Sequence, residues 1–154
     1  MTTIKRSWSG GTITGESAVV EHVIDELELQ RAKVAATKEK WGADGNERMA
    51  RLCRTFPTLR GVPGTEPWNA MHFLDWLCTS PAVTTGSDHA GRFVLQVWNP
   101  GTNWAELAMK SPADEGLGLK GIELEPFNVV QALAVWDSDH ERAFLEWCAL
   151  PFWP

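Results

Sequence analysis

The spacing of its apolar residues is the feature that most constrains what this chain can fold into. From Ser17 to about Trp41, apolar side chains recur at intervals of three, four and seven residues. Such intervals place them on one side of an α-helix, so the sequence predicts a helix over this range. Acidic residues near its start and lysines near its end match the polarity of the helix dipole. The apolar stripe consists of Val20, Ile24, Leu27, Val34 and Trp41.

Similar patterns, separated by segments rich in Gly and Pro, continue to the C-terminus. Helices are expected over residues 46–56, 67–78, 87–98, 102–109, 126–136 and 138–150, with a loop over 111–125. Residues 1–15 contain Gly10-Gly11 and are expected to form a hairpin or a flexible arm. The predicted fold is mainly α: a compact orthogonal bundle of about six or seven helices with a minor N-terminal β-hairpin or arm, in a single domain over 1–154.

Aromatic residues can supply the core of such a bundle, since the chain has nine Trp and six Phe. The three cysteines are widely and irregularly spaced, which is typical of reduced thiols and predicts a cytoplasmic protein. No apolar run approaches the length of a bilayer span, so no membrane partner is expected.

Charge is distributed unevenly along the chain. Residues 1–61 carry ten basic and eight acidic side chains, whereas residues 62–154 carry four and twelve. This balance argues against nucleic-acid binding by the whole surface but leaves one basic helix face as a candidate interaction surface. A solvated face is the simpler interpretation, and docking on an acidic protein or a phosphate backbone is the alternative. The face consists of Arg48, Arg51 and Arg54, with Arg60 nearby.

Two related motifs, "SDHAGRF" at 87–93 and "SDHERAF" at 138–144, place Ser, Asp and His in a row. Each serine is predicted to be an N-cap, and Glu141 lies where a capping box with Ser138 requires it. The alternative is a divalent metal site, but adjacent side chains on a helix point about 100° apart, so we favour caps and expect no metal. The residues of that alternative site are Asp88, His89, Asp139 and His140.

Signs of catalytic chemistry are few. His72 and Asp75, at i and i+3, are candidates for an acid–base pair, although a core histidine bound to a carboxylate explains them more simply. The segment "GGTITGES" nearly matches a phosphate-binding loop, but Glu16 occupies the lysine position and would repel phosphate. No cofactor is therefore predicted.

The C-terminal segment "LPFWP" presents Phe152 and Trp153 between prolines. These two rings either fold back onto the core or anchor a protein partner. Folding back is favoured, because exposed aromatic rings reduce solubility.

These features together favour a non-enzymatic protein-binding module: an adaptor, an inhibitor or a small subunit of a larger assembly. Uneven charge and abundant tryptophan suit an interface. A small, metal-assisted enzyme using the His and Asp residues above is the alternative, and nucleic-acid contact through the basic helix face comes third.

Overall fold

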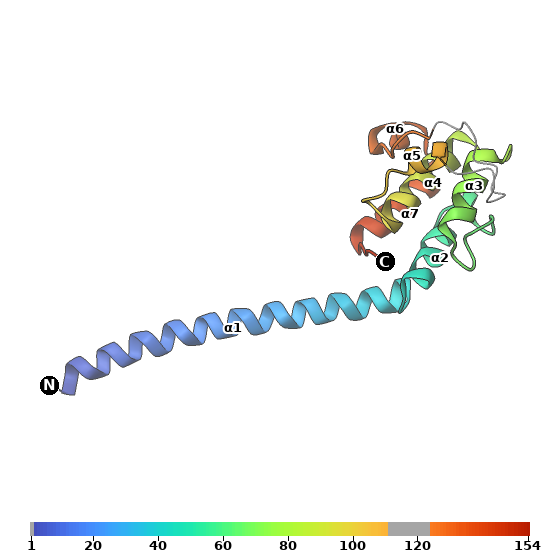
Figure 1. The fold of residues 1–154 in the computed structure, drawn as a ribbon. Coiled ribbons are helices and arrows are strands. Elements are labelled where there is room, and N and C mark those ends of the chain that lie inside the picture. Colours follow the sequence, from blue (N-terminus) through green and yellow to red (C-terminus); the bar gives the residue numbers. More distant parts are fainter. Residues whose placement is uncertain (1, 111–123) are drawn as a thin grey trace. The chain divides into compact units, whose positions relative to one another are not determined.

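The computed structural model describes residues 2–110 and 124–154, with side chains over 18–108 and 124–154. Within these ranges the regular structure is helical and no strand longer than an isolated bridge occurs, which confirms the mainly α prediction (Figure 1). The helices are α1 (Thr2–Trp41), α2 (Gly45–Thr55), the short 3-10 helix η1 (Pro57–Leu59), α3 (Ala70–Thr79), α4 (Thr85–Trp98), α5 (Trp104–Lys110), α6 (Val129–Val135) and α7 (Ser138–Ala149).

The N-terminal segment does not form the expected hairpin. Helix α1 already begins at Thr2 and continues through Gly10-Gly11 to Trp41. A two-stranded hairpin without a third strand or a covering helix is only marginally stable. A helix that is already nucleated downstream gains one hydrogen bond for each residue added, so its extension is the less costly outcome.

The chain separates into two units, Met1–Ala36 and Thr37–Pro154, with the boundary inside α1. The first unit is the greater part of α1. The second unit contains the last turn of α1 and all the other helices. That residues 1–154 behave as a single domain stays a prediction.

The second unit is built around α4, which packs against α2, α3, α6 and η1. Aromatic rings form a cluster within its core, as the composition predicts. Phe56 lies near the centre, with its ring centroid 5.9 Å from that of Phe93 and 5.8 Å from that of Trp136. The apolar face of α2 and the residue that follows the helix are fully buried: Met49, Leu52, Cys53 and Phe56.

Polar side chains mark where six of the helices begin, because each accepts a hydrogen bond from a backbone N–H of the first turn. In α4 the interaction is reciprocal, since Thr84 and Ser87 each bind the other's backbone N–H. The capping residues are Asp44, Asn69, Thr84, Asn103, Asn128 and Asp137.

The serines predicted as caps are therefore not the caps. Ser138 is the first residue of α7, and Asp137 caps that helix in its place. Ser87 lies in the first turn of α4, where its hydroxyl oxygen accepts the backbone N–H of Thr84 and completes a capping box. Both motifs do lie at helix starts. The sequence does not decide which residue is the cap, because several residues able to cap lie within each motif or just before it.

Helix α7 ends at Ala149, one residue before the predicted end at Leu150 and two residues before Pro151. Of the predicted loop over 111–125, residues 111–123 lie outside the described residues.

Candidate protein-binding surface

His140, a candidate metal ligand, is buried and has both ring nitrogens engaged. Nδ1 lies 2.7 Å from Oδ1 of Asp137, and Nε2 lies 2.8 Å from the hydroxyl oxygen of Thr58. Its ring also stacks on that of Trp136. The order Thr58–His140–Asp137 resembles a hydrolase triad, but a histidine side chain that is only 5% exposed has little access to a substrate. These contacts instead join η1 to the start of α7.

The other candidate metal ligands are dispersed. Asp88 forms an ion pair with Arg92 at 2.6 Å, and Asp139 pairs with Arg142. His89 is buried, with Nδ1 lacking a hydrogen-bond partner. Across the described ranges, no three His, Cys, Asp or Glu side chains are grouped as a metal ion requires.

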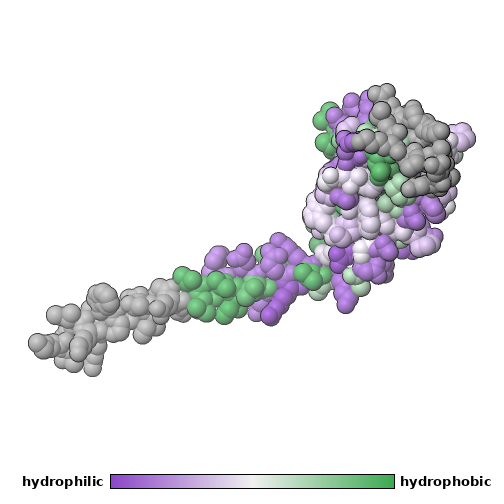
Figure 2. Space-filling model, viewed as in Figure 1, coloured by the Kyte–Doolittle hydropathy of each residue, from purple (hydrophilic) through white to green (hydrophobic). Residues whose placement is uncertain are grey.

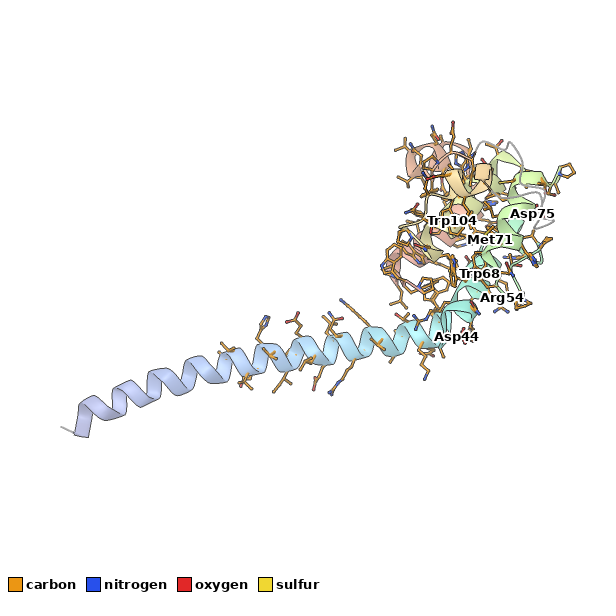
Figure 3. The ribbon with its side chains drawn as sticks, viewed as in Figure 1. Asp44, Arg54, Trp68, Met71, Asp75 and Trp104 are labelled. Atoms are coloured by element: carbon orange, nitrogen blue, oxygen red, sulfur yellow. The ribbon has the colours of Figure 1, made fainter. Side chains whose placement is uncertain are left out.

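The predicted acid–base pair does not form. His72 is exposed, whereas Asp75, which is labelled in Figure 3, is half-buried with a buried Oδ1 that has no hydrogen-bond partner. No hydrogen bond or ion pair joins the two side chains, so neither orients the other for proton transfer.

The cysteines are not activated for nucleophilic chemistry either. Burial raises the pKa of the Cys78 thiol to about 11, and the carboxylates of Asp88 and Asp75 act in the same direction. Burial also raises the pKa of Cys53 and of Cys148. A reactive cysteine needs the opposite shift, because the thiolate is the nucleophile.

The arginine face has extensive intramolecular partners. Arg51 donates hydrogen bonds to the carbonyl oxygens of Glu39 and Lys40 at 3.0 and 3.1 Å, and Arg48 donates to that of Gly42 at 3.1 Å. Arg51 thus satisfies two carbonyls that the C-terminal turn of α1 would leave open, and Arg48 binds the carbonyl of the residue that follows this helix.

The remaining two arginines lie further along the same surface. Arg54, which is labelled in Figure 3, pairs with Glu66 at 3.3 Å, and Arg60 donates to the carbonyl oxygen of Arg54. This basic face therefore contributes to the turn between α1 and α2 and to the loop after η1, a structural role that needs no phosphate ligand.

The two aromatic residues of the C-terminal segment have different environments. Phe152 is buried, and its ring centroid lies 5.3 Å from that of Trp41. Trp153 is 57% exposed, and its ring packs edge-on with that of Trp147, with centroids 5.4 Å apart. Phe152 thus folds back onto the core, as favoured above, and only Trp153 is available to a partner.

A pocket of about 240 Å³ lies beside α4 and α5. Arg92, Trp104 and Phe127 contribute to its lining. Among its described lining residues the one cationic side chain, Arg92, is already paired with Asp88 and, at 3.5 Å, with Glu125. These residues offer an anionic ligand no second cation, and they give no indication of a particular ligand.

Among the described residues, α1 carries the most exposed large apolar side chains. One side of its described part carries large apolar residues that are about half exposed or more, and Figure 2 shows them as a patch of hydrophobic residues on that helix. At about 100° per residue these side chains fall within roughly 100° of the helix circumference. We call them the α1 stripe: Val20, Val23, Ile24, Leu27 and Val34, which are 55%, 47%, 48%, 52% and 67% exposed.

The α1 stripe overlaps the predicted stripe but is not identical to it. Trp41 is buried in the second unit, so it belongs to that core. Val23 was not part of the predicted set, although its position three residues after Val20 is a helical interval. Leu29 is equally exposed at 54%, but it lies on the opposite side of α1.

No family model, curated protein or solved structure matches this chain. Within the described ranges, every helix is too short or too polar to cross a bilayer.

Proposed function

We propose that this chain is a non-enzymatic protein-binding module, an adaptor, inhibitor or small subunit of a larger assembly, and that the α1 stripe is its binding element. The observation that carries the proposal is the exposure of five branched apolar side chains along one side of a single helix. A contiguous exposed apolar surface of this kind is typical of an interaction site. Much of the stability of an amphipathic helix comes from covering its apolar face, so a partner would stabilise α1 as it binds.

The mode of binding follows from the geometry of the stripe. Apolar residues at intervals of three, four and seven residues along a helix suit a second helix or an apolar groove. Acidic side chains flank the first half of the stripe and basic ones the second half. A partner with the reverse order of charges would therefore be preferred over other helices of similar apolarity.

The two alternative functions have less support. The small-enzyme alternative relied on His72, Asp75 and the Asp-His motifs, whose side chains are unpaired, dispersed or buried. The nucleic-acid alternative relied on the arginine face, which has intramolecular partners. We further propose a cytoplasmic location, because the three cysteines are free thiols.

Leu27 and Leu29 provide a matched pair of variants to test the proposal. The two leucines are two residues apart on the same helix and are 52% and 54% exposed, but only Leu27 belongs to the α1 stripe. Replacing either with Asp introduces the same charge and the same helix propensity. We expect native-lysate pull-down with mass spectrometry to recover a common set of proteins with the wild type and with Leu29→Asp, and to lose it with Leu27→Asp. Identical recovery with all three baits would contradict the proposal.

A further inference from the structure

We propose that the α1 stripe pairs with the same stripe of a second copy of this chain, and that the two helices run antiparallel. This inference rests on the proposed function, since it names the occupant of the α1 stripe. It follows from two observations on α1: the heptad spacing of its apolar residues and the separation of its charges.

The heptad spacing is visible in three residues of the stripe. Val20, Leu27 and Val34 are seven residues apart and occupy position a of a heptad. Val23 and Gln30 follow three residues after an a position and occupy position d. Such a seam covers a helix that has the same pattern, because the side chains of each helix insert between those of the other.

The charges of α1 determine the orientation. Between residues 18 and 28 all the Lys, Arg, Asp and Glu side chains are acidic, whereas between residues 31 and 40 all but Glu39 are basic. In a parallel pair the acidic halves would face each other, as would the basic halves. In an antiparallel pair each acidic half faces a basic half, and the two helix dipoles are opposed. The acidic residues are Glu21, Asp25, Glu26 and Glu28; the basic residues are Arg31, Lys33, Lys38 and Lys40.

One register satisfies both patterns. When a positions lie opposite d positions, Val23 faces Val34 of the second copy and Leu27 faces Gln30. Glu26 of each copy then flanks Lys33 of the other, an attraction that occurs twice by symmetry. A parallel pair would also gain an attraction, between Glu26 and Arg31, but it would place Lys33 against Lys38.

This interface uses the same surface on both copies, so it closes after two chains and predicts a dimer, not a filament. Sedimentation equilibrium of the purified full-length chain over a wide micromolar range measures it directly. We expect reversible dimers for the wild type and for Leu29→Asp. Leu27→Asp should raise the dissociation constant by at least about tenfold, because each interface then contains two buried carboxylates.

Charge reversal tests the orientation. In the antiparallel pair Glu26→Lys and Lys33→Glu each create like-charge contacts and weaken the dimer, and the double variant restores it. In a parallel pair Lys33→Glu would instead relieve the contact with Lys38 and tighten the dimer. Tightening by Lys33→Glu would therefore overturn the antiparallel arrangement.

The outcomes also separate this inference from the proposed function. A wild type that is monomeric at every concentration would overturn self-pairing, while lysate partners lost only with Leu27→Asp would still support a binding module. Equal weakening by Leu27→Asp and Leu29→Asp would overturn a role of the stripe in self-pairing.

Discussion

The indole N–H of Trp41, at the end of α1, donates a 2.8 Å hydrogen bond to the carbonyl oxygen of Leu150, just after α7. The two residues are 109 positions apart. Phe152 packs against the ring of the same tryptophan, and the ammonium of Lys40 lies 3.4 Å from a carboxylate oxygen of Glu146. Helix α7 and the C-terminal segment therefore fix the last turn of α1 to the rest of the second unit.

Replacing Phe152 tests this role of the C-terminal segment. Its side chain is 3% exposed, so Phe152→Ala should lower the free energy of unfolding by about 3–5 kcal/mol, as for other buried Phe residues. Trp153 is 57% exposed, and Trp153→Ala should cost less than about 1 kcal/mol. Urea unfolding followed by circular dichroism measures both values. Equal losses for the two variants would show that Phe152 is not the anchoring residue.

Residues at the starts of α4 and α7 give a second comparison, because Thr84 caps its helix and Ser138 does not. Thr84 accepts a hydrogen bond from the backbone N–H of Ser87, so Thr84→Ala should cost about 0.5–2 kcal/mol of unfolding free energy. Ser138 is exposed at the first position of α7, and Ser138→Ala should change stability by less than about 0.5 kcal/mol. Thermal or urea unfolding distinguishes them. A larger loss for Ser138→Ala would restore that serine as the cap.

The sequence predicted the positions of the helices more accurately than it predicted their first residues, because the two depend on different signals. Apolar periodicity extends over many residues, so it identifies α2, α4 and α7 despite local ambiguity. A cap is a single side chain, and Asp, Ser and Thr are all able to fill it. In "WDSDH" both Asp137 and Ser138 qualify, and only the backbone geometry decides between them.

The candidate surface was only partly predictable for a different reason. Periodicity indicates that a helix has an apolar face, but it does not say what covers that face. Trp41 and Val34 share the predicted stripe, yet Trp41 is buried and Val34 is 67% exposed. The contacts of Arg51 with backbone carbonyl oxygens could not be predicted, because these groups have no sequence signature.

Arg51 and Arg54 test the structural role of the basic face. Because Arg51 binds two carbonyl oxygens at the end of α1, Arg51→Ala should lower the free energy of unfolding by about 1 kcal/mol. The side chain of Arg54 is 51% exposed in a surface ion pair, so Arg54→Ala should lower the free energy of unfolding by less than about 1 kcal/mol. This loss should be smallest in high salt, because salt screens the ion pair. Chemical denaturation measures both.

The same face allows a direct test of the nucleic-acid alternative. A phosphate-binding surface would retain DNA or RNA at low ionic strength and lose affinity steeply as salt is added, because each contact releases counterions. We expect no retention in a filter-binding assay at low salt. Salt-sensitive binding that the replacement of Arg48, Arg51 and Arg54 abolishes would revive this alternative.

The last prediction concerns pH and the start of α7. The backbone N–H of His140 donates to Oδ1 of Asp137, and with the hydrogen bond from the ring of His140 it holds the pKa of this carboxyl below its usual value of 3.8. A carboxyl group whose pKa is lowered by folding stabilises the protein at pH values above its unfolded pKa. This contribution is lost as the pH falls through the folded pKa.

Asp137→Asn tests this contribution, because asparagine retains a capping oxygen but its side chain does not titrate. Between about pH 5 and pH 3 the wild type should therefore lose more unfolding free energy than Asp137→Asn, as measured by urea denaturation. Glu47, whose pKa is also lowered, is common to both proteins, so parallel pH profiles would remove Asp137 as a source of acid sensitivity.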